Sequence, residues 1–497
     1  MKNWFFVFLL IPVLGACQIK SEQMVLLKIK EDPTISFRLL FKVGSQNDPQ
    51  GKEGLAALTA EMISDAGSAE DSYEEVLAKL YPMAAGIGSS VDKEMTVISG
   101  RTHKDNLAAY YQLLSNALLK PAFAEKDFAR IKDNTLSYLK KNLRYSQDEE
   151  LGKEVLSSFI FEGTPYAHPE EGLVSSVESI TLEDVRDFYK TNYTRANLMV
   201  GLAGGFDDDL VEKLEKDLAS LPQGTPSAVP APQPTPLKGT SVKIVSKGAP
   251  ATAISFGFPI NALRGDRDFY ALALATSWLG EHRNSFSHLY QVIRETRGLN
   301  YGDYAYVEHF PNGGRRQFPP PNVARRRAIF QIWIRPVPNE AKVFAFRAAL
   351  RELQHLVDRG MSAEDFEMTR KFLRNYNLHY APTTMMKLGY AMDDRFYGIK
   401  DGHWKRYAEM LDELTLEDVN AALRKHFSYQ NLKAVFITDA SQVEELKATL
   451  IGNTPSPISY SSPKPEEVLD EDKVISTFPL SISAGDITVE EVDTVFQ

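Results

Sequence analysis

The sequence has one cysteine in 497 residues, and this scarcity excludes several kinds of site. A single cysteine allows no internal disulfide and no zinc site built from several thiolates. Positive charge is not in excess either, because 66 acidic residues outnumber 56 basic ones. Since nucleic-acid binding needs a basic surface, we predict no nucleic-acid partner. The charged (25%) and hydrophobic (43%) fractions are typical of a folded chain, and the length predicts at least two domains.

The position of the cysteine indicates its role. An apolar run over residues 4–14 is too short for a stable membrane anchor but fits a signal peptide. Leu14-Gly15-Ala16-Cys17 is similar to a bacterial lipobox. We therefore expect residues 1–16 to be a lipoprotein signal peptide and Cys17 to carry the lipid that anchors the protein on the periplasmic side of the envelope. Gln18 favours the outer membrane. The alternative is a buried cysteine in a small hydrophobic hairpin.

A proline-rich segment at 221–240 divides the chain. Its six prolines favour an extended linker, because proline interrupts helices and central strands. The linker separates an N-terminal domain (17–220) from a C-terminal domain (241–450). The remaining tail, 451–497, is expected either to wrap the domain or to bind a neighbour.

The two domains repeat one another. Thr181-Leu182-Glu183-Asp184-Val185 recurs as Thr415-Leu416-Glu417-Asp418-Val419, and Asn197-Leu198 recurs as Asn431-Leu432 at the same offset. This order predicts a duplication. Strand-like and helical patterns interleave without strict alternation, so we predict an α+β fold. Extra sequence in the second copy is assigned to 310–327, which we expect to be an exposed basic loop.

Three segments resemble the pitrilysin/insulinase (M16) peptidase family. They are the opening of the first copy, a turn near residue 161 and a segment of the second copy: Phe41–Asp48 with Gly54-Leu55-Ala56, Phe161–Tyr166, and Leu289–Tyr301. The resemblance covers nearly the whole mature chain. It implies two homologous α/β-sandwich-like halves, of the M16/LuxS metallohydrolase type, that form a clamshell.

The residues for zinc chemistry are missing. In the family, an HxxEH motif after "GLA" supplies two histidine ligands and a glutamate base. Here Ala57 and Glu61 occupy the histidine positions, and Ala60 occupies the base position. The third ligand, a glutamate expected within 124–148, has only Glu125 as a candidate. We predict that this chain binds no metal and no other cofactor.

An arginine and a tyrosine of the family pattern are present. Arg294 is expected on the last turn of a helix, Gly298 in a left-handed cap, and Tyr301 at the start of a strand. The resemblance implies that Arg294 grips substrate carbonyls and that Tyr301 helps to hold the oxyanion of the transition state. Arg297 is expected to be structural. The alternative is that Arg294 and Tyr301 are structural as well.

The resemblance, with the zinc ligands missing and Arg294 and Tyr301 present, implies a non-catalytic subunit of a heterodimeric M16-type endopeptidase. Its partner would carry HxxEH and the zinc ion, and Arg294 and Tyr301 would act in trans on an unfolded peptide. The peptide is expected to bind as an added strand at a sheet edge. The alternative is a periplasmic scaffold or peptide-binding lipoprotein without a peptidase role. The ligand losses disfavour a peptidase that acts alone.

Overall fold

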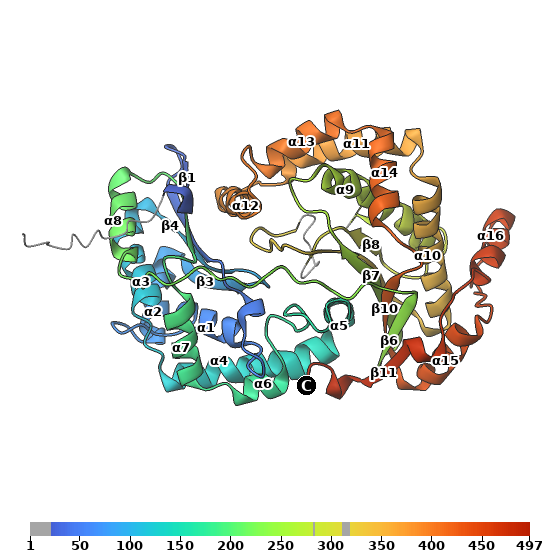
Figure 1. Ribbon diagram of the computed structural model, residues 1–497, viewed down its shortest axis with the longest axis horizontal. Coiled ribbons are helices and arrows are strands. Elements are labelled where there is room, and N and C mark those ends of the chain that lie inside the picture. The colour runs from blue at the N-terminus through green and yellow to red at the C-terminus, as the bar shows by residue number, and fades with distance from the viewer. Residues whose placement is uncertain (1–20, 282–283, 311–318) are drawn as a thin grey trace, which may run out of the picture.

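The computed structural model describes residues 21–281, 284–310 and 319–497, and it has two halves joined by an extended segment (Figure 1). The signal peptide and lipidation site expected at residues 1–17 lie outside this range. No helix in the described ranges is long and apolar enough to cross a membrane. Residues 222–237 form neither helix nor strand, and this part of the linker runs between the halves.

The first half is built on a five-stranded sheet in the order β1-β5-β2-β4-β3. Alternating apolar residues of its central strands face the core, where Phe37 and Phe41 are fully buried. The strands are β1 Met24–Lys28, β2 Thr34–Phe41, β3 Gly86–Val91, β4 Thr96–His103 and β5 Leu198–Gly204. The helices are α1 Leu55–Ser64, α2 Tyr73–Leu80, α3 Leu107–Leu119, α4 Glu125–Ser137, α5 Asp148–Ile160, α6 Val174–Ser179, α7 Leu182–Asn192 and α8 Asp208–Leu218. A π-helical segment, Tyr138–Ser146, connects α4 to α5.

The second half is built on a six-stranded sheet in the order β11-β6-β10-β7-β9-β8. The strands are β6 Thr240–Lys247, β7 Ala251–Ile260, β8 Asp303–Tyr306, β9 Ala328–Pro338, β10 Leu432–Asp439 and β11 Ile487–Glu491. The helices are α9 Arg267–Gly280, α10 Lys342–Arg359, α11 Ala363–Tyr376, α12 Thr384–Tyr397, α13 His403–Glu413, α14 Leu416–His426, α15 Val443–Gly452 and α16 Glu466–Ser476. A second π-helical segment, Tyr290–Glu295, precedes β8.

The repeated sequence motifs occupy equivalent places in the two halves. The Thr181 side chain accepts a hydrogen bond from the Asp184 amide at the start of α7. The Asp184 carboxylate accepts one from the Thr181 amide, and the two bonds form a capping box. Thr415 and Asp418 form the same capping box at the start of α14. Each of these helices precedes a central strand, β5 or β10, that is paired on both sides. The mixed α+β composition and the two-half clamshell agree with the prediction.

Each half lends one helix to the sheet of the other (Figure 1). Helix α5 leaves the first half and packs on β7, β9 and β10. Helix α12 does the reverse and packs on β1, β2 and β5. There Leu388 and Met392 lie in one buried cluster with Val25, Leu40 and Met199. Both sheets therefore bury one face against a helix from the opposite half.

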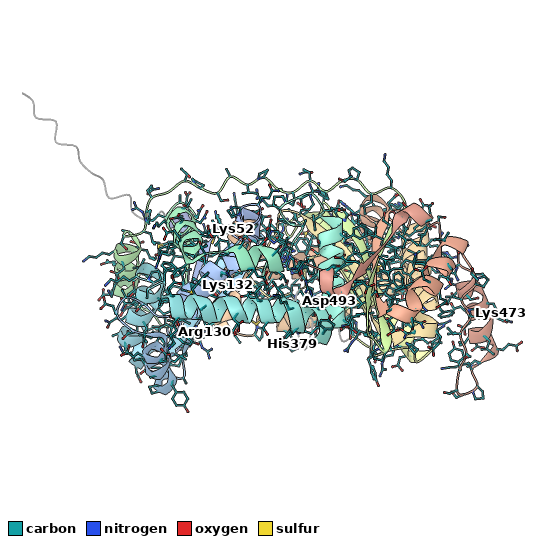
Figure 2. The ribbon with its side chains drawn as sticks, turned by 90° about the horizontal axis from the view of Figure 1, so that it is seen from below. Lys52, Arg130, Lys132, His379, Lys473 and Asp493 are labelled. Carbon is teal, nitrogen blue, oxygen red and sulfur yellow. The ribbon has the colours of Figure 1, made fainter. Side chains whose placement is uncertain are left out.

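The tail contacts both halves. Strand β11 pairs in parallel with β6 and adds to the second sheet. Beyond it, Val492 and Val495 enter the hydrophobic core of the first half. Arg144 donates to the Val495 carbonyl from Nε at 2.8 Å and from Nη2 at 2.5 Å. Figure 2 labels Asp493 near the end of the long helix of the first half. The tail thus wraps its own chain.

Candidate functional site

Helix α1 holds the degenerate zinc motif, and Asp48 fixes where it begins. The amides of Gly54 and Ala56 donate to the Asp48 carboxylate at 2.8 and 2.7 Å. Gly54 has φ +102°, and a Cβ there would lie 2.5 Å from the carbonyl oxygen of Glu171. Only glycine fits this position. The Gly54 conformation and the Asp48 hydrogen bonds together fix the start of α1.

The three motif positions lie on α1 with unequal exposure. Ala57 is partly exposed, Ala60 is fully buried, and Glu61 is half-buried. Glu125, the candidate for the third ligand, is exposed at the first residue of α4. The described residues contain no group of three or more His, Cys, Asp or Glu that would hold a metal ion. Two alanines and one glutamate do not fit a catalytic zinc ion.

Glu61 is a half-buried acid with a second acid one turn away. Burial and then the Asp65 charge raise the pKa of Glu61 to about 7, while Arg130 opposes both. Arg130, labelled in Figure 2, extends from α4 and donates to Asp65 Oδ2 at 2.7 Å. The arginine therefore neutralises Asp65 in the turn that follows Glu61, which is consistent with a structural role for this end of α1.

Strand β3 lies beside α1 and forms the edge of the first sheet. Ser64 at the end of α1 donates to Ser89 of β3 at 2.8 Å. Gly86, Gly88 and Ser90 are exposed along the strand. An edge strand presents unpaired N–H and C=O groups, with which an extended peptide can pair.

Arg294 and Tyr301 flank a turn in the second half. Arg294 lies in the π-helical segment, where its side chain pairs with Glu295 and covers the Tyr290 ring at 4.9 Å. Gly298 has φ +71°, as its predicted place in a left-handed cap requires. In the described structure, no hydrogen bond or ion pair joins Arg294 to Tyr301.

The prediction that Tyr301 opens a strand is wrong, because β8 begins at Asp303. Gly302 is the last residue before it, and its carbonyl accepts from the Arg335 amide at 3.2 Å. Arg335 also pairs with Glu149 of α5 at 3.2 Å. Tyr301 is 78% exposed next to this contact between the halves, so its hydroxyl is accessible.

Arg297 is structural, as predicted. It is 3% exposed, and it donates to Asp472 and Glu471 of α16, each at 2.8 Å. It also donates to the Val292 carbonyl at 2.7 Å. The residue thus ties the tail to the π-helical segment.

The prediction of an exposed basic loop at 310–327 is wrong for its described end. Residues 311–318 lie outside the described part of the chain. Arg325 is 5% exposed and donates to both oxygens of Asp92, at 2.6 and 3.0 Å, and to Glu170 at 3.0 Å. Arg326 pairs with Glu94. The arginines point into the first half because buried carboxylates there need cationic partners.

This ion cluster between the halves was not predicted. Lys93 completes it with a 3.0 Å pair to Glu170. Burial acts to raise the pKa of Glu170, but Lys93 and Arg325 outweigh it and hold the pKa well below its usual range. The one signal in the sequence was the unbroken charged run Asp92-Lys93-Glu94 between two strands.

For two further acids near this cluster, the positive charges of the cluster do not outweigh burial. Burial and then the Glu170 charge raise the pKa of Glu154 to about 8 and that of Glu171 to about 7. The Glu61 charge also raises the pKa of Glu171, so the acid on α1 interacts electrostatically with this one. The acids beside the degenerate motif therefore have pKa values raised toward neutral pH.

Comparison with known proteins identifies the family. Residues 23–171 match the model described as "Insulinase (Peptidase family M16)", and residues 179–373 match "Peptidase M16 inactive domain". A non-peptidase homolog, YmxG, of Helicobacter pylori is 20% identical over 410 residues, which cover 81% of this chain and 88% of that protein. An uncharacterized zinc protease of Rickettsia felis is 24% identical over 285 residues, 56% of this chain and 66% of the relative's length.

Solved structures agree on the fold. A structure from Pseudomonas fluorescens, titled as a peptidase M16 inactive domain, has a TM-score of 0.73 at 22% identity and covers 84% of this chain and 95% of its own. The structure of a protease from Helicobacter pylori has a TM-score of 0.69 at 17% identity. The match covers 84% of this chain and 96% of that protease chain. Both halves of the duplication are thus matched, and the chain belongs to the M16 (insulinase) peptidase family.

Proposed function

We propose that the protein is the non-catalytic subunit of a zinc-dependent M16 endopeptidase. The observation that carries the proposal is the donor set of α1, where Ala57, Ala60 and Glu61 replace the two histidines and the glutamate base. Similarity to an inactive-domain model and to a non-peptidase homolog supports it. A partner chain with HxxEH would hold the zinc ion and the general base.

The role proposed for this chain is to bind the peptide and stabilise the transition state. The exposed Tyr301 hydroxyl lies near the contact between the halves, where a peptide held between this subunit and its partner would reach it. Arg294 has a partly exposed guanidinium whose described partners, Glu295 and the Tyr290 ring, lie near the surface. A peptide carbonyl can compete for such a group. The peptide would extend along the edge of a sheet, with β3 as the accessible edge beside α1.

Reconstitution with an HxxEH subunit tests this role. We expect Arg294→Ala and Tyr301→Phe each to lower kcat/KM for a fluorogenic peptide by about 10²–10³, as removal of an oxyanion donor does. Arg374→Ala and Tyr81→Phe are matched controls, because both side chains are exposed in other parts of the chain. Normal cleavage by both test variants, with assembly intact, would show that the pair has no part in the reaction.

A scaffold or peptide-binding lipoprotein is the second candidate, favoured because no hydrogen bond or ion pair joins Arg294 to Tyr301 in the described structure. Purification from the native envelope separates the two. Recovery with an HxxEH chain supports the subunit, whereas recovery alone or in an unrelated assembly supports the scaffold. The lipid anchor at Cys17 and the outer-membrane location are part of both proposals, and mass spectrometry of the mature N-terminus tests them.

A further inference from the structure

A cavity of about 70 Å³ lies inside the second half, far in sequence from the degenerate motif. It opens between α9, α11, α13 and the segment that follows β8. Aromatic rings form much of its wall, and two carboxylates reach it. Its lining includes Phe269, Glu281, Glu308, Tyr380, His403 and Tyr407.

The two carboxylates differ in their partners. Glu308 is neutralised by Arg264, whose Nε donates to it at 2.8 Å. Glu281 accepts one hydrogen bond, from the Ser277 hydroxyl, and no lysine or arginine of the described chain pairs with it. A carboxylate at an apolar wall without a cation is costly, and a positive ligand would offset that cost.

The aromatic wall suits the same kind of ligand. The negative faces of Phe and Tyr rings attract cations, most strongly where water is excluded. Tyr407 lines the cavity and is 8% exposed. His403 is held neutral, because burial lowers its pKa well below the usual value and its ring nitrogens are bonded to Tyr270 and Tyr380 at 3.2 and 3.3 Å. The pocket therefore contains no competing positive charge from His403.

We propose that this cavity binds an organic cation, a guanidinium or alkylammonium group, through Glu281 and the ring of Tyr407. Its volume has room for several water-sized groups, which suits a cationic head of four or five heavy atoms. The head comes either from an arginine or lysine side chain of a peptide or from a free amine. The proposal does not rest on the proposed function, because it concerns this chain alone.

The proposed site has a defined pH dependence. Burial raises the pKa of Glu281 to about 7, so the acid is neutral at pH 5.5 and charged at pH 8.5. Among the other groups that line the cavity, Glu308 is paired with Arg264, and burial raises the pKa of Tyr380 well above its usual value. Burial, and then the Glu281 charge, raise the pKa of Tyr376 and Tyr407, and His403 stays neutral. Binding should therefore strengthen between pH 5.5 and 8.5.

Calorimetry with ethylguanidinium and n-butylammonium chloride on the full chain tests the site. We expect saturable binding at pH 8.5, weakened about tenfold or more both by Glu281→Gln and by lowering the pH to 5.5. Tyr407→Phe keeps the ring and should keep binding, whereas Tyr407→Ala should weaken it. Glu364→Gln, at an exposed residue of α11, is the matched control and should bind as wild type. Circular dichroism checks the fold of each variant.

A competition experiment identifies the source of the cation. A short peptide with one arginine should displace ethylguanidinium if the ligand is a side chain, and its citrulline counterpart should not. Displacement by n-butylammonium but not by the arginine peptide would indicate a free amine. The absence of saturable binding by either probe, or equal binding by Glu281→Gln and wild type, would overturn the proposal.

Discussion

Arg325 joins the two halves through a buried ion cluster, and its replacement by methionine should destabilise the protein. Methionine keeps the length and apolar stem of the side chain but removes two bonds to Asp92, at 2.6 and 3.0 Å, and one to Glu170 at 3.0 Å. Glu170 retains Lys93 at 3.0 Å. Among the described residues, the Asp92 carboxylate, in a residue 4% exposed, then retains only the backbone amide of Lys93 at 2.7 Å.

The expected loss of unfolding free energy follows from the carboxylate charge that is left unpaired. Removing one partner of a buried pair costs about 3–5 kcal/mol, because the remaining charge stays desolvated. Arg374 provides the control, since its 2.8 Å pair with Asp412 is exposed on both sides and such pairs contribute about 0–1 kcal/mol. Adding Asp92→Asn to Arg325→Met should recover part of the loss, with a coupling energy of about 0.5–3 kcal/mol.

Urea unfolding followed by two probes measures this effect. In a protein expressed without residues 1–20, the tryptophans are Trp278, Trp333 and Trp404, all in the second half, so tryptophan fluorescence reports on that half. Far-UV circular dichroism reports on both halves. We expect coincident transitions in the wild type and separated transitions in Arg325→Met. A loss of unfolding free energy no greater than that of Arg374→Met, with coincident transitions, would refute the role assigned to the cluster.

Three further predictions concern α1, the tail and pH. Gly54→Ala should destabilise by about 1–3 kcal/mol, since φ is +102° and the Cβ would meet Glu171, whereas Gly86→Ala has open space and should be nearly neutral in the same urea assay. Deletion of residues 492–497 should speed hydrogen exchange at the amides of Val174 and Ser175, which donate to Phe496 and Gln497 at 2.9 Å, but not at Val185 in α7; unchanged exchange at all three would contradict the tail contact. The pKa of Glu154 is raised to about 8, so the folded state holds more protons between about pH 4.5 and 8, and the unfolding free energy should fall as pH rises through that window. Glu154→Gln should flatten this dependence in thermal unfolding curves recorded at pH 6 and 9, and an equal slope in both proteins would exclude Glu154 as the source.

The repeat, the helix caps and the apolar core could be predicted from sequence because they depend on local patterns. Thr181 and Thr415 show this best, since a threonine followed three residues later by an aspartate specifies a helix start with no reference to the rest of the chain. The glycine at 298 is equally local, because a left-handed residue ends a helix wherever it occurs.

The contacts between the halves could not be predicted in this way. An amphipathic pattern shows that α5 and α12 each bury a face, but it does not show which sheet receives that face. The arginines at 325 and 326 were interpreted as solvent-exposed because they follow three prolines in a basic segment. Their partners, Asp92 and Glu94, lie 233 and 232 residues away, and no local pattern connects charges at that distance.

These contacts also limit how the proposed subunit could admit a peptide. Four features connect the halves: the α4–α5 helical connection, helix α12, the tail and the Arg325 cluster. Opening the clamshell within one chain would break several buried contacts together, each with a cost of its own. If the chain acts as proposed, we therefore expect the peptide to enter between this subunit and its HxxEH partner rather than between its own halves. Peptide entry would then depend on assembly, with the edge strand β3 and Tyr301 already accessible in the isolated chain.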